Sequence, residues 1–271
     1  MTLFPHLFQH TTAKAPFLWA PGIIQAILIY AHASGVFEPD TAEHYLKRHK
    51  DTFSVSGRND WNKKRGGYGV DAIVDGVLIS TAFDVVYDWK DHIRYAFMSD
   101  FAKEDESDSG DVSWLIKAHF NVVQFYDWMF KHESLIPPVP EYTDPLGRVL
   151  SYSTVLHKVE ECRAGGIAPM AYGAIYAASR SFWEEHREWG LYCKNGQPMS
   201  FGGWLQFMDI SKGSSWRRHI LSEFCGVTQK TGFMGIHMDT YGFPKDAYNV
   251  DGVPVDLAAE FSTLIHDVKE C

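Results

Sequence analysis

The chain has 271 residues, of which 45% are hydrophobic and 22% are charged. That length suits two domains, and that composition excludes a disordered chain or a coiled coil. The formal net charge of -9, with no long basic run, argues against nucleic acid as a partner, because phosphate groups require a positive surface.

Aromatic side chains are abundant, with nine Trp and thirteen Tyr. They either fill the core or stack on sugar rings, and composition alone leaves both interpretations open. The most apolar stretch, Phe17–Tyr30, is short and interrupted by Pro21 and Gly22, so we expect no membrane partner. The four cysteines form no CxxC pair and their spacing suggests no zinc site, and we expect no metal and no cofactor.

The N-terminal third has the pattern of short strands. Ile23–Tyr30 is rich in β-branched residues, and Tyr68–Val74 and Val77–Val86 flank an Asp-Gly hairpin signal. Thr41–Lys50 favours a short helix. Several short strands separated by turns predict a small β-sandwich.

From Arg94 onward, predicted strands alternate with predicted helices. The strands are expected at Arg94–Phe101, Asn121–Trp128, Ile167–Tyr176 and Phe233–Asp239. The helices are expected at Val112–His119, Thr154–Ala164, Ser214–Lys230 and Leu257–Lys269, with Ser214 as an N-cap. Alternation of this kind predicts a parallel sheet, and strands that end in polar residues are typical of a (β/α)8 barrel. Because a closed barrel needs eight units and four are found, we expect the first half of a barrel; a smaller α/β sheet is the alternative.

Carboxylates and aromatic rings gather at the predicted strand ends. They are Asp100, Tyr126, Asp127, Trp128, Tyr172, Tyr176, His237 and Asp239. In a barrel these ends face one bowl, where active sites lie. Carboxylates beside aromatic rings suit cleavage of a glycosidic bond, because one carboxylate attacks or stabilises the oxocarbenium-like centre and another protonates the leaving oxygen.

Each of these residues also has a structural interpretation. Asp100 could cap a loop, and Asp127 could form a buried ion pair with Arg94. Asp239, before a Gly-Phe-Pro turn, is explained equally well as a turn residue. We expect His237 to share the face of Asp239 only if the strand bends there, which leaves its role balanced between core and site.

Five segments in this order resemble glycoside hydrolase family 66, the dextranases and cycloisomaltooligosaccharide glucanotransferases. They are Arg94–Phe101, Asn121–Trp128, Asp144–Arg148, Ala171–Tyr176 and Gly235–Gly242. Ser80–Val85, with Asp88 and Trp89, looks like the end of that family's N-terminal immunoglobulin-like domain. The resemblance covers Tyr68 to the C-terminus.

The resemblance implies a multidomain β plus α/β chain, with an immunoglobulin-like β-sandwich at residues 1–92 and the first half of a (β/α)8 TIM barrel at residues 93–271. It implies internal cleavage of an α-1,6-glucan (dextran) with retention of configuration, with transglycosylation as a second outcome. It also implies a secreted or cell-surface location.

By the same resemblance, Asp239 is the nucleophile. The partner is a polysaccharide or oligosaccharide, bound by Asp100, Tyr126, Asp127, Trp128, Tyr172, His237 and Tyr241. The family's acid/base is a Glu at the end of the sixth strand, which we expect to lie beyond Cys271. Glu260 and Glu270 are expected to face away from the bowl, and Glu184 and Glu185, in the excursion before the fourth strand, could reach its rim but belong to no recognised motif.

Two other functions remain open. One is a barrel glycosidase for another glucan linkage. The other is a non-catalytic carbohydrate-binding fragment, which the missing acid/base favours.

Overall fold

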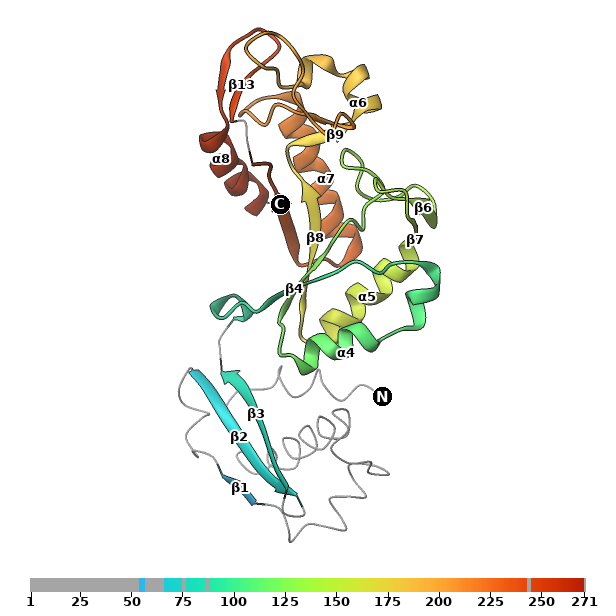
Figure 1. Ribbon diagram of the computed structural model, residues 1–271, viewed down its shortest axis with the longest axis vertical. Coiled ribbons are helices and arrows are strands. Elements are labelled where there is room, and N and C mark those ends of the chain that lie inside the picture. The colour runs from blue at the N-terminus through green and yellow to red at the C-terminus, as the bar shows by residue number, and fades with distance from the viewer. Residues whose placement is uncertain (1–53, 57–65, 75–76, 86–87, 243–244, 271) are drawn as a thin grey trace. The chain divides into compact units, whose positions relative to one another are not determined.

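The computed structural model describes residues 54–56, 66–74, 77–85, 88–242 and 245–270 (Figure 1). The chain divides into two compact units. The first runs to Arg94 and also includes Leu115–Asn121 and Ala164–Gly166, and the second holds the remaining residues.

The first unit contains a three-stranded antiparallel sheet in the order β1-β2-β3. Its strands are β1 (Ser54–Ser56), β2 (Gly66–Val74) and β3 (Val77–Val85). The pairing of Val74 with Val77 confirms that two strands flank the predicted Asp-Gly hairpin. The predicted strand at Ile23–Tyr30 and helix at Thr41–Lys50 lie outside the described residues, so the β-sandwich stays a prediction.

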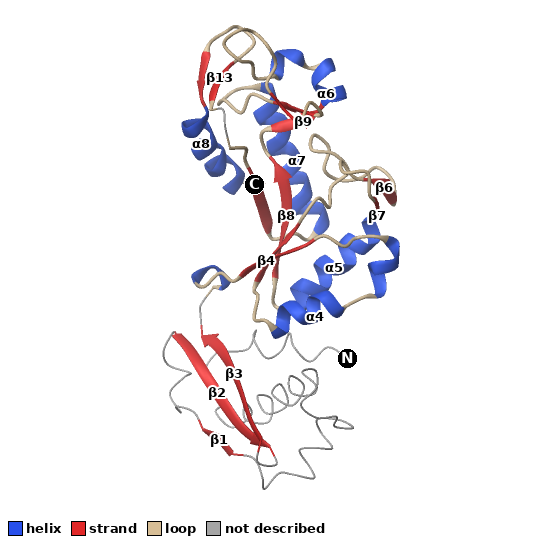
Figure 2. Ribbon diagram, viewed as in Figure 1, coloured by secondary structure: helices blue, strands red, loops and turns tan. Residues whose placement is uncertain are grey.

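The second unit is built on a four-stranded sheet in which every neighbouring pair is parallel, in the order β4-β5-β8-β12. The strands are β4 (Tyr95–Met98), β5 (Val122–Phe125), β8 (Ala168–Ala174) and β12 (Gly235–Asp239). The helices that follow them are α4 (Gly110–Lys117), α5 (Tyr152–Ala164), α7 (Ser215–Thr231) and α8 (Leu257–Lys269) (Figure 2). The alternation of strand and helix is confirmed, and it fits the first part of a (β/α)8 barrel.

Smaller elements occupy the connections. They are the 3-10 turns η1 (Trp89–Asp91), η2 (Lys103–Ser107) and η3 (Arg187–Trp189), the hairpins β6 (Glu141–Thr143) with β7 (Val149–Ser151) and β13 (Asp246–Tyr248) with β14 (Pro254–Asp256), the helix α6 (Arg180–Glu185), and the sheet β10-β11-β9. In that sheet β9 is Ala177–Ser179, β10 is Ser200–Phe201 and β11 is Leu205–Phe207.

Three of the four strands, β4, β5 and β8, end earlier than predicted, whereas β12 ends at Asp239 as predicted. β5 stops at Phe125 because Asp127 takes a left-handed backbone conformation, with φ of 49°, which an extended strand does not allow. β8 stops at Ala174, and the Tyr176 carbonyl then accepts a hydrogen bond from the Met208 N–H, which starts the next sheet. These early ends leave Asp127 and Tyr176 in loops above the strands.

One face of the parallel sheet is covered by helices. Gly173 is the clearest marker, because a Cβ at that position would lie 2.6 Å from a ring carbon of Phe224 on α7. Glycine therefore lets the helix approach the strand closely. On the same unit, the fully buried rings of Phe125 and Trp128 both pack on Phe233, with ring centroids 5.0 and 4.9 Å away.

The opposite face of the sheet, termed the open face, carries aromatic and polar side chains. The strand register aligns Tyr172 with His237 and Ala174 with Asp239. Tyr95 and Phe97 on β4 point to this face and are 42% and 69% exposed. Large rings that remain accessible on a sheet indicate a binding surface or a face that another element covers.

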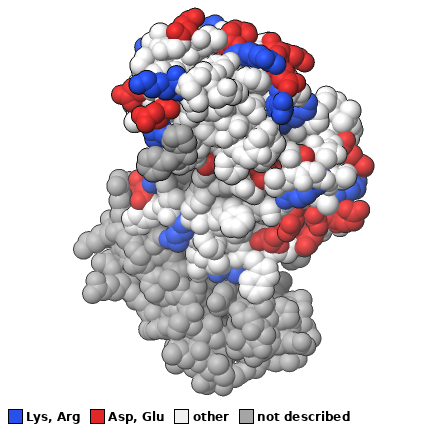
Figure 3. Space-filling view, turned by 45° about the horizontal axis from the view of Figure 1, so that its top comes forward, with Lys and Arg blue, Asp and Glu red and all other residues white. Residues whose placement is uncertain are grey.

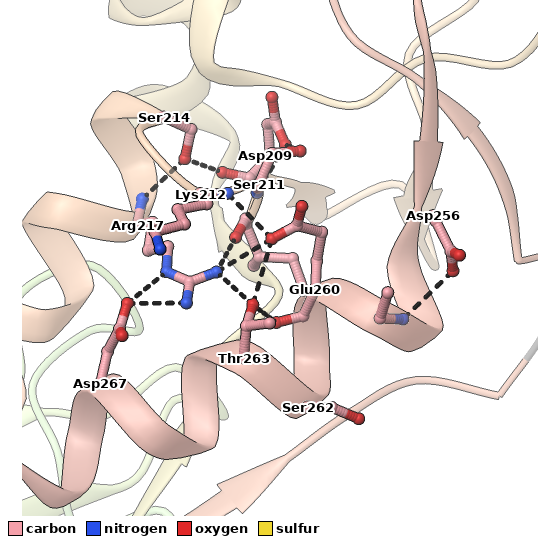
Figure 4. A network of polar contacts seen from close by, with 12 residues as sticks. Asp209, Ser211, Lys212, Ser214, Arg217, Asp256, Glu260, Ser262, Thr263 and Asp267 are labelled. Carbon is pink, nitrogen blue, oxygen red and sulfur yellow. Dashed lines mark hydrogen bonds and ion pairs between the residues drawn. The ribbon is translucent and has the colours of Figure 1, made fainter.

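A buried arginine joins the last two helices (Figure 4). Arg217 on α7 donates to Glu260 at 3.0 Å and to Asp267 at 2.7 and 2.9 Å, both on α8. It also donates to the Ile210 carbonyl at 3.1 Å. The predicted N-cap is confirmed, since the Ser214 hydroxyl accepts from the Arg217 N–H at 3.1 Å.

Within the described ranges, no helix combines the length and the apolar composition that a bilayer crossing requires.

Candidate active site

Asp239 ends β12 on the open face, and a single hydrogen bond orients its side chain. The Tyr172 hydroxyl donates to Asp239 Oδ2 at 2.8 Å. The Asp239 carbonyl accepts from the Ile175 N–H at 3.2 Å, which ties the strand end to β8. The other carboxylate oxygen, Oδ1, makes no hydrogen bond with any described residue, so it is available to a ligand.

Tyr172 is suited to this role because it is itself fixed. Its backbone carbonyl accepts from the Trp128 indole N–H at 3.2 Å, and its ring lies 5.0 Å from that of Tyr126. Burial, followed by the charge of Asp239, raises the pKa of Tyr172, so the phenol stays protonated and donating at any working pH.

His237 shares the open face with Asp239 without any bend in the strand. The expectation that a bend is needed is wrong, because residues two apart on a strand point to the same side. Both lie within the regular strand β12, and the His237 ring stacks against Tyr172 at 6.0 Å. Its Nδ1 lies 2.5 Å from the Tyr95 hydroxyl. Burial lowers the pKa of His237, against the opposing charge of Asp239, which favours a neutral imidazole.

Asp127 is a buried carboxylic acid whose environment resists ionisation. Burial raises its pKa to about 6, although the nearby Arg148 guanidinium acts in the opposite direction. Arg148 also donates to the Asp127 carbonyl at 3.2 Å. The alternative of an ion pair with Arg94 does not apply, because the cation that acts on Asp127 is Arg148, and Arg94 Nε donates to the His119 carbonyl. Asp127 can therefore act as a hydrogen-bond donor below about pH 6 and as an acceptor above it.

The raised pKa of Asp127 predicts a pH-dependent effect of Asp127→Asn. The protonated carboxyl stabilises the fold fully below about pH 4, and this contribution is lost as the pH rises through 6. Asparagine stays neutral and tolerates the left-handed backbone. Between pH 3.5 and 7, the free energy of unfolding of the wild type should fall by about 2–3 kcal/mol relative to the variant.

Urea unfolding at several pH values measures this difference. Asp100→Asn is the control, since Asp100 is exposed and makes no hydrogen bond or ion pair with a described residue. A difference between wild type and Asp127→Asn that stays constant across the range would contradict the assignment.

Aromatic rings continue from Asp239 toward the β9-β11 sheet. Tyr176 lies 5.1 Å from Tyr241, and Tyr241 lies 4.1 Å from Phe207, measured between ring centroids. The buried Tyr241 hydroxyl has no hydrogen-bond partner among the described residues. The Lys245 ammonium lies 4.4 Å from the centre of its ring. Tyr241 thus combines an unsatisfied polar atom with an aromatic cluster, as a sugar-contacting residue would.

Two residues predicted to bind substrate stand apart from this cluster. Trp128 is fully buried, so its place is beneath Tyr172, where it supports the site and has no surface for a ligand. Asp100 is exposed beyond the end of β4. The roles predicted for Tyr126, Asp127, Tyr172, His237 and Tyr241 stay predictions, and these five residues lie at the strand ends or directly after them.

Sequence reasoning missed Tyr95 and Gln124. The Tyr95 hydroxyl donates to Gln124 Oε1 at 3.0 Å and also contacts His237, so it links three strands across the open face. Burial raises the pKa of Tyr95 to about 12. The sequence did hold a signal for Tyr95. Tyr95 and Phe97 alternate on β4 with small or helix-facing residues, and this alternation predicts that both rings lie on the same face of the sheet.

The carboxylates of Glu260 and Glu184 are engaged elsewhere. Glu260 bonds Arg217 and the Lys212 N–H, which confirms that it faces away from the bowl. Glu184 pairs with Arg180 on the exposed side of α6 at 3.0 Å. Neither side chain contacts Asp239.

The comparisons with known proteins decide the family. The sequence model of glycosyl hydrolase family 66 matches residues 47–271. The chain belongs to this family. The family predicted from the five segments is therefore confirmed.

Individual relatives and a solved structure agree with this family assignment. Two cycloisomaltooligosaccharide glucanotransferases from Niallia circulans are each 27% identical, over 212 and 205 residues. Each alignment covers 70% of this chain and 21% of the relative, so the chain spans about a fifth of the length of these curated relatives. A crystal structure of a Paenibacillus sp. cycloisomaltooligosaccharide glucanotransferase, complexed with cycloisomaltoheptaose, is 26% identical with a TM-score of 0.69. That similarity covers 77% of this chain and 32% of the other.

Proposed function

We propose that these residues form part of a retaining, endo-acting glycoside hydrolase for α-1,6-glucan, with Asp239 as the nucleophile. The observation that carries the proposal is the environment of Asp239. One carboxylate oxygen is held by Tyr172 and the other has no partner among the described residues, at a strand end beside exposed aromatic rings. Membership of the family and the bound cyclic oligosaccharide of the Paenibacillus relative support a glucan as the ligand.

In the proposed reaction, Asp239 Oδ1 attacks the anomeric carbon as the bond to the leaving oxygen breaks. A general acid gives its proton to that oxygen. The resulting glycosyl ester on Asp239 is then opened by water, or by a sugar hydroxyl if the enzyme transglycosylates, and the proton of that nucleophile returns to the deprotonated general acid as Asp239 leaves. Tyr172 keeps Oδ2 hydrogen-bonded throughout, which fixes the direction from which Oδ1 attacks.

The neighbours of Asp239 are suited to holding sugar hydroxyls. A protonated or ionised Asp127, a neutral His237 and the Tyr95 phenol offer both donors and acceptors. On the described part of the face in Figure 3, basic and acidic side chains are interspersed around a largely uncharged area.

The general acid is left unassigned among the described residues, since Glu184 and Glu260 are bound to arginines. A retaining pair needs its two carboxyl groups about 5–5.5 Å apart. Binding of carbohydrate without cleavage is therefore the second candidate for this chain.

A substrate panel separates the candidates. Dextran, pullulan, starch and a β-glucan are incubated with the chain and with the longest natural protein that contains it, and reducing ends are counted. We expect internal cleavage of dextran alone, with the α-configuration kept in the first product. Cleavage of another polymer in preference to dextran would overturn the linkage assignment, and dextran binding without any cleavage would favour the second candidate.

A further inference from the structure

A buried histidine outside the Asp239 cluster lacks any hydrogen-bond partner. His132 is 4% exposed, and neither of its ring nitrogens is bonded to a described residue. An imidazole has two polar nitrogens, and leaving both unsatisfied in a protein interior is unfavourable because each has lost its hydrogen bonds to water. Because buried polar groups in native proteins are nearly always hydrogen-bonded, we looked for a ligand that could bond to both ring nitrogens of His132.

The backbone around His132 is held firmly. Glu133, the next residue, accepts hydrogen bonds from the Ser179 N–H at 2.9 Å and the Ser179 hydroxyl at 2.6 Å. Its carbonyl lies 2.6 Å from His219 Nε2 on α7. Because β9 and α7 both contact Glu133, the backbone next to His132 is fixed relative to these two elements.

His132 lines a cavity of about 190 Å³, together with Phe130, Thr143, Asp144, Ser179 and Trp204. That volume is below the roughly 300–1,000 Å³ of sites for drug-sized ligands. It therefore suits a single ring-sized unit. Asp144, one wall of the cavity, is fixed by Arg148 Nε at 2.7 Å.

An aromatic platform stands beside the histidine. The Trp204 ring centroid lies 6.1 Å from that of His132, and its indole remains 41% exposed. Trp204 sits at the turn between β10 and β11, where Gly202 has a φ of +60° and a Cβ there would lie 2.8 Å from Trp204 Nε1. Glycine is thus required for the indole to lie against the turn. Phe201 packs edge-on to Trp204 at 6.4 Å and is 55% exposed.

The protonation state of His132 suits a hydroxyl partner. Burial lowers its pKa to about 4, against the opposing charges of Glu133, Asp239 and Asp144, so the ring is neutral near pH 7. A neutral imidazole has one donor and one acceptor, which is the pair that a sugar hydroxyl complements.

We propose that the His132 cavity is a subsite for one hexopyranose unit, in which the imidazole exchanges hydrogen bonds with ring hydroxyls and Trp204 covers one ring face. This inference rests on the proposed function, because it takes the unit to be part of a glucan bound across Asp239. The cavity lining carries one acidic and one basic residue, Asp144 and Lys131, beside the neutral imidazole, so it does not select a charged ligand. An apolar ligand would leave both ring nitrogens unsatisfied.

The test measures binding of isomaltotriose and dextran to the chain and to its His132→Gln and Trp204→Ala variants, by titration calorimetry and affinity electrophoresis. His132→Gln removes about one hydrogen bond to the sugar, and Trp204→Ala removes the stacking surface for one ring face. Each variant should therefore bind roughly three- to tenfold more weakly than the wild type. In the wild type, the His132 ring nitrogen NMR signals should shift when isomaltotriose is added. His157→Ala and Trp114→Ala are matched controls, because His157 and Trp114 are exposed on helices, and both should bind like the wild type.

An Asp239→Asn background separates this inference from the proposed function. If Asp239→Asn abolishes cleavage while His132→Gln and Trp204→Ala bind as the wild type does, the subsite is overturned and the nucleophile stands. If both variants weaken binding in either background, the subsite is supported even where Asp239→Asn still cleaves. Should His132→Gln fail to fold by circular dichroism, Trp204→Ala decides, because its side chain is partly exposed. Failure of the wild type to bind any of these sugars also overturns the subsite.

Discussion

Replacing Asp239 by Asn should lower the rate of dextran cleavage by on the order of 10⁴-fold or more, because an amide cannot form the glycosyl ester that the proposed mechanism requires. The amide keeps the shape of the carboxylate and can still accept the Tyr172 hydrogen bond through its oxygen. The fold should therefore be unaffected, and oligosaccharide binding should change little. The rate is measured by release of reducing ends, in the longest natural form of the protein that cleaves dextran.

Tyr172→Phe supplies the graded comparison. It removes the hydroxyl that fixes Oδ2 but leaves the nucleophile, so the rate should fall by roughly 10- to 100-fold, with the larger change in kcat rather than KM. Tyr152→Phe, on α5 and away from Asp239, is the matched control. An Asp239→Asn protein that cleaves within tenfold of the wild type would refute the assignment, because a nucleophile cannot be dispensable.

The strand-helix alternation could be predicted because it depends on local patterns. The helix at Leu257–Lys269 has its predicted bounds, and Ser214 caps α7 as its position in the sequence indicates. The end of β12 at Asp239 was predicted correctly, whereas the end of β5 was placed too late, because Asp127 leaves the extended conformation through a positive φ. That conformation depends on tertiary contacts with Arg148 and cannot be read from an apolar run.

The site was predictable in part for a similar reason. Asp239 and Tyr172 carry recognisable chemistry at strand ends, so sequence reasoning reached both. Their hydrogen bond needs the register that pairs His237 with Tyr172, which only the folded sheet supplies. His132 was missed altogether, because nothing in its local sequence shows that both ring nitrogens lack partners and line a cavity.

Family membership and local geometry support different parts of the conclusion. The family match covers residues 47–271 and says which kind of enzyme to expect. The geometry says why Asp239 differs from Asp127: the first has an oxygen free of described partners, whereas the second is buried and resists ionisation. Two carboxyl groups with such different environments can share one site without both acting as nucleophiles.

Arg217→Ala should lower the stability of the fold substantially, by about 2–3 kcal/mol of unfolding free energy. The guanidinium is almost fully buried and bonds Glu260, Thr263 and Asp267 on α8, so its removal leaves two carboxylates without their cation. It also leaves the buried Ile210 carbonyl without this donor. We expect a smaller loss of unfolding free energy than for a fully buried ion pair, because the side chains of Glu260 and Asp267 are 24% and 41% exposed.

Arg218→Ala is a close control, since Arg218 is the next residue on α7 but is exposed and bonds only near its own helix start, at Gly213 and Ser215. It should shift the urea midpoint little, and Arg217→Lys should recover only part of the loss because an ammonium lacks the two-pronged geometry that Asp267 receives.

Hydrogen exchange should locate the effect, with faster exchange of α8 amides than of β8 amides in Arg217→Ala. If the Arg217 and Arg218 variants unfold at the same urea concentration, the network in Figure 4 does not hold α8 to α7. Because α8 follows β12 after the β13-β14 hairpin, loss of this anchor should also weaken oligosaccharide binding, whereas Arg218→Ala should leave it unchanged.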